Sequence, residues 1–254
     1  MSMDRLNRIW PPLLVIAVVV AVWWIVVDYS GSLIFPTPGQ VAAGTVELAR
    51  NGTLWQHIVA SLVRVATGFL IAVLVALPLG LWMGRVDAAY RTLNPVFQIL
   101  RPISPIAWIP IAILWFGVGD TSPVFLIFLA AVFPLILQTA AGVHAIDARY
   151  LRAAENFGVP SAKLFRQVIV PAVLPEILTG MRIALGVAWL VVVAAEMIVR
   201  SSGLGYLIMD SRNAGNRYDL VVAAMIIIGL IGLGIDFLMR RLEGLKGVRW
   251  RYGR

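Results

Sequence analysis

Residues 144–175 read HAIDARYLRAAENFGVPSAKLFRQVIVPAVLP and form the longest polar interval in an otherwise apolar chain. Seven side chains in it are acidic, basic or imidazole groups: His144, Asp147, Arg149, Arg152, Glu155, Lys163 and Arg166. On a helical wheel, four others form a narrow stripe: Ile146, Tyr150, Ala153 and Phe157. This pattern predicts a short amphipathic helix. Gly158 is a typical C-cap and Pro160 prevents continuation, so we expect a second short helix to begin at Ser161.

The overall composition predicts a membrane protein. Of the 254 residues, 60% are apolar and 13% are charged, whereas soluble domains average about 45–50% apolar. The net charge of +8 would suit nucleic acid. The basic residues, however, gather in short loops and in residues 240–254, as in proteins that follow the positive-inside rule. We therefore expect a lipid bilayer, and no nucleic acid, as a partner.

Six apolar runs are long enough to cross about 30 Å of hydrocarbon. They are residues 9–28, 58–84, 95–117, 123–142, 172–200 and 219–240. The predicted fold class is therefore an all-α membrane protein with six transmembrane helices. The first run lacks a small-x-small cleavage site and is interpreted as a retained span. Prolines punctuate the third run, so we expect that helix to be kinked or broken.

The runs divide the chain into four parts. These are an N-terminal transmembrane helix (1–34), an external amphipathic segment (35–57), a transmembrane core (58–241) and a basic tail (242–254). Within the core, Gly80-x-x-x-Gly84 matches a motif for close helix packing.

The loop charges predict the orientation in the membrane. Most arginines and lysines fall in one alternate set of loops, which is therefore cytoplasmic. Six spans then place both termini in the cytoplasm, together with residues 144–175 between spans four and five. A structured cytoplasmic loop is a natural docking site for a soluble partner.

Motifs for catalysis are absent from the sequence. There is no Gly-x-x-x-x-Gly-Lys phosphate loop, no His-Glu-x-x-His, no Gly-x-Ser-x-Gly and no cysteine. His57 and His144 fall on opposite sides of the predicted membrane, which argues against a shared metal site. We therefore expect a protein that is not an enzyme and has no cofactor of its own. The energy for any pumping would come from a partner or an ion gradient.

The polar stretch resembles the EAA loop of ABC importer permeases. That loop reads Glu-Ala-Ala, three residues, Gly, nine residues, Ile-x-Leu-Pro. Four residues match at the same spacing: Ala153, Ala154, Gly158 and Pro171. Arg152 stands where the family has glutamate, and valines replace the isoleucine and leucine.

Further stretches resemble the nitrate, taurine and aliphatic-sulfonate branch of these permeases. They are Pro36-Thr37-Pro38, Ser61-Leu62-x-Arg64-x-x-x-Gly68-Phe69, residues 100–117, Ala194-Ala195-Glu196-Met197 and Gly203-Leu204-Gly205-Tyr206. The resemblance covers most of residues 35–240. It implies the MetI-like fold of a type I importer permease in the bacterial inner membrane. Such a permease would move a small anion of the nitrate, sulfonate, taurine or bicarbonate type by alternating access.

The resemblance also implies partners. They are a second permease subunit, expected as a homodimer, two cytoplasmic ABC ATPases that hold ATP and Mg, and an extracytoplasmic binding protein. The loop 144–171 would carry the coupling helix that docks into an ATPase. Its coupling residues would be Arg149, Arg152, Ala153, Ala154, Glu155, Asn156, Phe157, Gly158 and Pro171.

Charged side chains at membrane depth cost about 2.5–3.5 kcal/mol each on insertion scales. Five residues are candidates for the translocation pathway: Arg101, Pro105, Trp108, Arg182 and Glu196. Two interpretations stay open, an Arg–Glu pair with a structural role and a charged group that guides an anion. Arg182 and Arg64 could instead extend toward the inner and outer interfaces, respectively.

Two other function classes are alternatives. An ion-coupled secondary transporter or channel would need no ATPase, but it would be expected to show inverted repeats and midplane carboxylates. Neither is evident in the sequence. A membrane-embedded enzyme would need a convergent cluster of catalytic side chains, and no such cluster is apparent.

Overall fold

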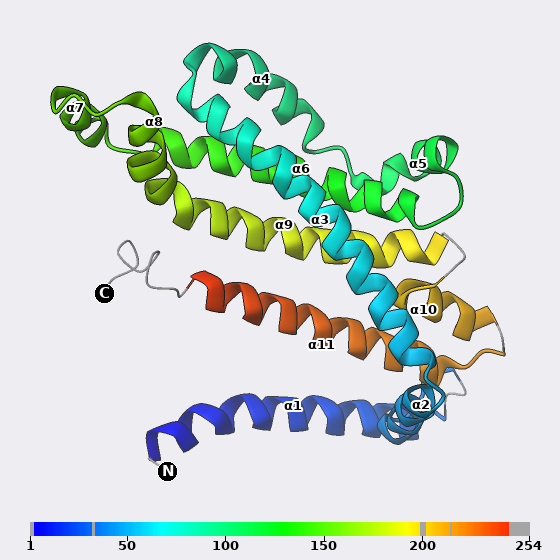
Figure 1. Ribbon diagram of the computed structural model, residues 1–254. Coiled ribbons are helices and arrows are strands. Elements are labelled where there is room, and N and C mark those ends of the chain that lie inside the picture. Colours follow the sequence, from blue (N-terminus) through cyan, green and yellow to red (C-terminus); the bar gives the residue numbers. More distant parts are fainter. Residues whose placement is uncertain (1–2, 32–33, 199–201, 214, 244–254) are drawn as a thin grey trace.

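The computed structural model describes residues 3–31, 34–198, 202–213 and 215–243, which fold into a bundle of helices (Figure 1). The Glu155 side chain and tail residues 244–254 lie outside the described part. Within these described ranges, five helices are long and apolar enough to cross a membrane. They are α1 (Met3–Ser30), α3 (Thr53–Arg85), α6 (Thr121–His144), α9 (Val170–Ile198) and α11 (Tyr218–Glu243). The prediction of an all-α membrane protein is confirmed.

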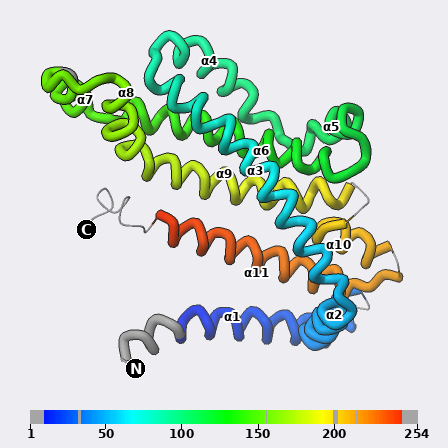
Figure 2. The backbone as a smooth tube through the Cα atoms, viewed as in Figure 1, coloured from blue at the N-terminus to red at the C-terminus, as the bar shows by residue number. Residues whose placement is uncertain are grey.

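Helices α3, α6 and α9 form the centre of the bundle. α6 packs extensively against both α3 and α9, α11 packs on α9, and α1 touches little but α2 (Figures 1 and 2). Small side chains line these contacts and are almost completely buried: Ala72, Ala76, Ala131, Ala140 and Ala184. Small residues allow helix backbones to approach closely, and van der Waals contact then holds the helices together in lipid.

The predicted third span is a broken helix pair. α4 (Asp87–Leu100) is followed by the 3-10 helix η1 (Pro105–Trp108) and α5 (Ile109–Phe116), with a bend of 82°. The prediction of a single run over 95–117 is therefore wrong in its bounds, since α4 begins directly after Val86. Its expected break is confirmed. Ser104, which precedes Pro105, has ψ 127°, because a proline disfavours the helical region for the preceding residue.

Two short helices lie at the end of the bundle opposite α7 (Ala148–Asn156) and α8 (Ser161–Leu164) (Figure 1). One is α2 (Pro38–Arg50), which begins with a capping box: Thr37 N donates to Gln40 Oε1 at 2.8 Å and Gln40 N donates to Thr37 Oγ1 at 3.3 Å. The other, α10 (Leu204–Asn213), was not predicted. α1 begins, and α11 ends, at the α7 end.

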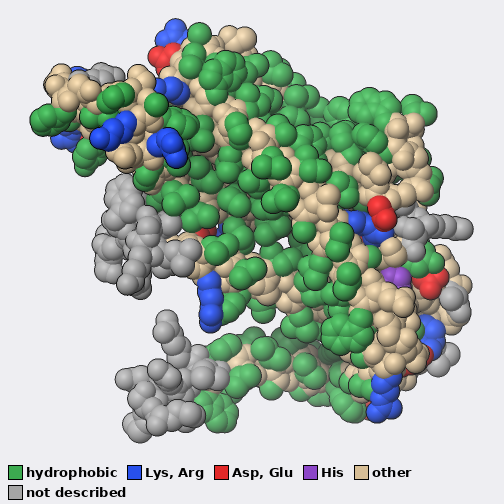
Figure 3. Space-filling view, viewed as in Figure 1, with side chains coloured by type: hydrophobic (Ala, Val, Ile, Leu, Met, Phe, Trp, Pro, Cys, Tyr) green, Lys and Arg blue, Asp and Glu red, His purple; other side chains and the backbone are tan. Residues whose placement is uncertain are grey.

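Hydrophobic side chains cover most of the face of the bundle that Figure 3 shows. Leu74, Leu190 and Leu230 are each at least 62% exposed. A bundle in water would bury such side chains, whereas a bilayer solvates them. The exposed leucines therefore agree with helices that face lipid.

The α3–α6 contact generates a stability prediction. A methyl group at Gly84 would lie 2.5 Å from Val143 Cβ. Gly84→Val should therefore force the helices apart and cost about 1–3 kcal/mol, measured as a lower Tm of the protein in detergent. Gly234→Val is the matched control, since a side chain there meets nothing within 4 Å. Equal losses in both variants would contradict close packing at Gly84.

Candidate functional site

The polar stretch forms a separate helix, α7, which its own residues cap at the start. Asp147 Oδ1 accepts a hydrogen bond from Arg149 N at 2.9 Å, and Asp147 Oδ2 accepts one from Arg149 Nε at 2.8 Å. The first bond satisfies the Arg149 backbone N–H, which has no partner inside the helix. The Arg149 side chain, and then its backbone N–H, lower the pKa of Asp147 below its ordinary value.

Gly158 ends α7, as predicted. Its φ of +67° lies in the left-handed region, which favours glycine because other residues meet a Cβ clash there. Val159 N donates to Ala154 O at 3.1 Å and Phe157 N to Ala153 O at 3.1 Å. The first bond is the six-to-one bond of a Schellman motif. α7 is therefore capped locally at both ends.

The side of α7 that packs differs from the predicted stripe. Leu151 and Ala154 contact a buried cluster that includes Ile169. Tyr150 is 69% exposed and Phe157 is 87% exposed, so two large aromatic side chains of the stripe face outward. Of the stripe, Ile146 packs on the same cluster. A helical wheel identifies apolar side chains but not the surface that covers them.

The exposed side of the segment from α7 to the residues just before α9 is basic. Arg149, Arg152, Lys163 and Arg166 are exposed, and Arg149 pairs with Asp147. In Figure 3, lysine and arginine side chains gather over the end that carries α7 and α8. Arg152 Nε makes one long bond, 3.4 Å, to Ala148 O. Exposed Asn156 completes this surface of α7.

α7 is joined to the long helix α9 without a flexible linker. After α8, a π-helical turn η2 (Phe165–Ile169) leads directly into α9. Leu164 and Ile169 are 2% and 1% exposed and anchor this turn in the core. The exposed Pro171 lies in the first turn of α9.

A buried ion pair lies toward the opposite end of the bundle. Arg64 on α3 is 4% exposed and Glu196 on α9 is 1% exposed, and Arg64 Nη1 donates to Glu196 Oε1 at 2.6 Å. The Ser61 hydroxyl lies 2.9 and 2.8 Å from the two Glu196 oxygens. The possibility that Arg64 extends to the outer interface is thus wrong: Glu196, 132 residues away, holds it inside.

The same cluster caps α10. Leu204 N donates to Ser61 Oγ at 2.9 Å, and Gly205 N donates to Glu196 Oε2 at 3.1 Å. Gly203 N donates to His57 Nδ1 at 2.9 Å. The first N–H groups of a helix have no partner inside the helix. Here side chains of α3 and α9 supply the acceptors, which ties α10 to both helices.

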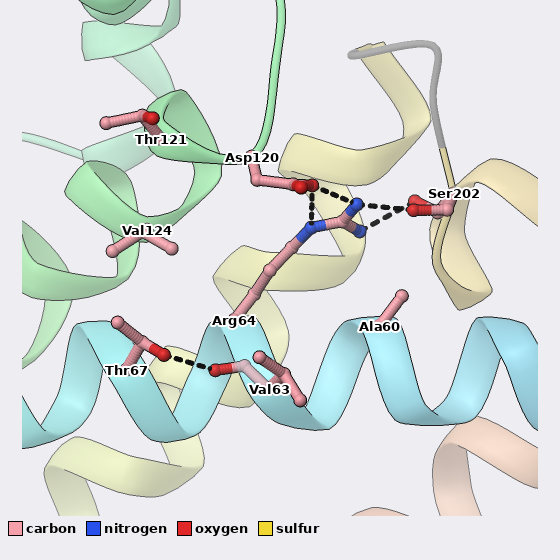
Figure 4. A pocket seen from close by; sticks show the side chains of 8 residues that line it. All are labelled: Ala60, Val63, Arg64, Thr67, Asp120, Thr121, Val124 and Ser202. Carbon is pink, nitrogen blue, oxygen red and sulfur yellow. Dashed lines mark hydrogen bonds and ion pairs between the residues drawn. The ribbon is translucent and has the colours of Figure 1, made fainter.

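Asp120, which precedes α6, completes the cluster and borders a pocket (Figure 4). Its Oδ1 accepts from Arg64 Nε at 2.9 Å and from Arg64 Nη2 at 2.5 Å. The Asp120 side chain is 74% exposed, against 5% for that of Arg64. The pocket beside them has a volume of about 470 Å³.

The other predicted pathway residues lie elsewhere. Arg182 Nε donates to Asp236 Oδ1 at 2.6 Å and its Nη1 to Glu243 Oε2 at 3.4 Å, which links α9 to α11. Arg101 is exposed at the start of the break that follows α4, where Pro105 begins η1 and Trp108 ends it, both half-buried. Glu196 and Arg182 therefore have separate partners, and the structure does not bring the five candidates together.

Sequence reasoning missed Asp120 and the pairing of Arg64 with Glu196. The signal for α10 was present, since Leu204, Leu207 and Ser211 recur at helical spacing and are all buried. No comparable local signal marks Asp120. Among the described residues, no group of three His, Asp or Glu side chains could hold a metal ion.

These features define a polytopic helical membrane protein with an exposed, capped helix between the long helices α6 and α9. Residues 76–245 match the family model for the binding-protein-dependent transport system inner membrane component. The chain belongs to this family, and is an ABC importer permease subunit. This membership sets aside the ion-coupled secondary transporter and the membrane-embedded enzyme.

Relatives cover most of the chain. It is 38% identical to the taurine transport system permease protein TauC of Escherichia coli, over 91% of this chain and 88% of that protein. It is 36% identical to the nitrate import permease protein NrtB of Synechocystis, over 92% and 88%, respectively. An archaeal ABC transporter permease protein of Methanocaldococcus jannaschii is 44% identical over 79% and 75%.

A solved structure has the same fold. An inward-facing MetNI methionine ABC transporter chain superposes with a TM-score of 0.66 over 76% of this chain and 96% of that chain, at 18% identity. The predicted MetI-like fold is thereby confirmed.

The Asp147 cap predicts how α7 depends on pH. Because the folded state lowers the pKa of Asp147, the cap contributes fully above the ordinary pKa of about 3.9 and is lost as pH falls through the lowered value. Asp147→Ala should therefore speed amide hydrogen exchange in α7 several-fold at pH 7, whereas Asp147→Asn, which retains a capping oxygen, should change it less. Unchanged exchange in the alanine variant would contradict the cap.

The buried pair predicts a large loss for Glu196→Ala. Arg64 would keep its charge in a buried site without this carboxylate, at a cost of about 3–5 kcal/mol. Tm measured in detergent should fall accordingly, and less for Glu196→Gln, which keeps the shape and an acceptor oxygen. The control is Glu47→Ala, which removes an exposed partner of Arg217 and should change Tm little. Similar Tm values for both alanine variants would refute a structural role of the pair.

Proposed function

We propose that this chain is the membrane subunit of an ATP-driven importer of a small anion, and that α7 is the helix that couples it to a cytoplasmic ATPase. The observation that carries the proposal is α7 itself. It is an independent helix, capped at both ends, that projects two aromatic side chains and joins α9 through a buried turn. ATP and Mg would be held by the ATPase.

The exposed side chains define the expected ATPase surface. Buried aromatic anchors dominate the binding energy of many interfaces, so Tyr150 and Phe157 would enter apolar pockets of the partner. Arg152 would face an acidic group there, since it carries the opposite charge to the glutamate usual in the EAA loop. Glu155, three residues further on, adds a negative charge to the same short segment.

The loop charges favour an orientation with α7 and both termini in the cytoplasm of a bacterium, and the bundle in its inner membrane. α2 and α10 would then face outward, where a binding protein delivers substrate. A second copy of the chain would complete the translocation pathway. The broken segment at Arg101, Pro105 and Trp108 is suited to line it, because irregular backbone at membrane depth is tolerated where it borders a water-filled cavity.

The substrate class rests on the relatives, which are named for taurine and nitrate transport. Both are small molecules that carry a planar or tetrahedral oxyanion group. We infer an anion of this chemistry, in the range of nitrate, sulfonate, taurine and bicarbonate. Alternating access would be driven by closure of the ATPase pair, which moves α7 and, through it, α9.

Removal of an aromatic anchor tests the proposal. Phe157→Ala should lower ATPase copurification and ATP-driven anion uptake in proteoliposomes by at least about tenfold, as hot-spot truncations of about 2 kcal/mol do. The permease should keep its Tm, because Phe157 is 87% exposed.

Tyr29→Ala serves as the matched control, since Tyr29 is 94% exposed but lies on α1. It should retain copurification and uptake. Normal ATPase binding by the Phe157 variant would contradict docking through α7. Uptake by the wild-type complex that does not depend on ATP would contradict the importer itself.

A further inference from the structure

The pocket beside Arg64 has the composition of a small-ligand site. Apolar and hydroxyl side chains form most of its lining, with a single charged end, as is usual for such sites. Its residues come from α3, from the start of α6 and from the segment before α10: Ala60, Val63, Arg64, Thr67, Asp120, Thr121, Val124 and Ser202. Figure 4 shows the Arg64 side chain reaching from α3 toward Asp120 and Ser202.

Arg64 is held rigidly from one side. Its Nη1 donates to Glu196 Oε1 at 2.6 Å and to the Ser202 carbonyl oxygen at 2.7 Å, and its Nη2 donates to Ser202 Oγ at 2.6 Å. These bonds fix the plane of the guanidinium before any ligand arrives. A pre-positioned arginine loses little conformational entropy when it binds an anion.

Along its Nε–Nη2 edge, the guanidinium meets the Asp120 carboxylate. Nε and Nη2 both donate to Asp120 Oδ1. The two parallel N–H groups of such an edge fit carboxylate, sulfonate and other oxyanions. The Asp120 side chain reaches the Nε–Nη2 edge from a mostly exposed position. Its carboxylate therefore pairs with Arg64 without being buried as Arg64 is.

We propose that the Nε–Nη2 edge of Arg64 is a binding seat for a small oxyanion, which Asp120 occupies in this conformation and vacates when the anion arrives. The proposal deepens, and rests on, the function proposed above, since it assigns the anion a site toward the outer end of α3. The exchange replaces one negative charge with another. It therefore avoids leaving the buried Arg64 and Glu196 with an altered net charge.

The tethered carboxylate also sets the affinity. Asp120 competes at the high effective concentration of an intramolecular group, typically millimolar. It therefore weakens binding of a free anion at this seat. A weak, exchangeable site suits transport, where an anion must leave as readily as it enters.

The test is to remove the competitor. In the purified transporter complex, Asp120→Ala should tighten the apparent binding of nitrate and methanesulfonate by about tenfold, given an intramolecular competitor of this kind. Binding is measured from the dependence of Tm on anion concentration in phospholipid-free detergent, with chloride as the reference salt. The Asp120 side chain makes no capping bond to α6, and its backbone carbonyl, which accepts from Val124 N at 3.3 Å, is unchanged in the variant, so the variant should fold.

Two further variants make the result specific. Asp210→Ala removes another exposed carboxylate, on α10, and should leave anion affinity unchanged. Asp120→Ala combined with Arg64→Lys should lose the gain, because lysine keeps the charge but not the planar edge.

Several results would overturn the seat. They are an unchanged affinity in Asp120→Ala, an equal gain in Asp210→Ala, a gain that survives Arg64→Lys, and a signal that appears only when anionic phospholipid is added. The last would assign the seat to a lipid headgroup. ATP-driven anion uptake by the wild-type complex is scored separately, so failure of the seat and failure of the proposed function remain distinguishable.

Discussion

The structure depends on one buried ion pair, Arg64 with Glu196. Burial of two charges is costly unless their geometry is good and their remaining polar atoms find partners. Here Ser61, Ser202 and the backbone of α10 supply those partners. Because each partner lies on a different segment, the requirement to satisfy one charge pair fixes α3, α9 and α10 relative to one another. A side chain at Gly203 would overlap the Glu196 carboxylate, so only glycine lets the backbone approach this closely.

The two ends of the bundle are stabilised by different kinds of interaction. Long-range bonds between buried groups hold the end with Arg64, whereas α7 is defined by local caps at Asp147 and Gly158. Local caps let α7 keep its shape while its outer side remains open to a partner. α9 connects the two ends. Its 29 residues, at about 1.5 Å each, begin directly after α8 and the turn η2 and carry Glu196 near their other end. A displacement of α7 would therefore reach the ion pair through one continuous helix.

The broken segment from α4 to α5 shows how prolines shape the chain. Prolines remove hydrogen-bond donors and restrict the residues before them, so residues 101–104 leave the helix and the chain turns by 82° between α4 and α5. The loop that returns from α5 to α6 carries Asp120 to Arg64. The break thus contributes to the pocket indirectly, by setting where the next loop runs, although its own residues do not line the pocket.

The sequence by itself determined the features that depend on neighbouring residues. Apolar runs predicted the spans, and Gly158 predicted the end of α7. The resemblance of residues 152–171 to the EAA loop, at Ala153, Ala154 and Gly158 among others, predicted the permease family. Only the tertiary structure decided that Glu196 pairs with Arg64, that Arg182 pairs with Asp236, and that Tyr150 and Phe157 face outward. Partners separated by more than 50 residues leave no local pattern, since their contact arises from the packing of whole helices. A helical wheel likewise identifies an apolar face, but which face is covered depends on the elements that pack beside it.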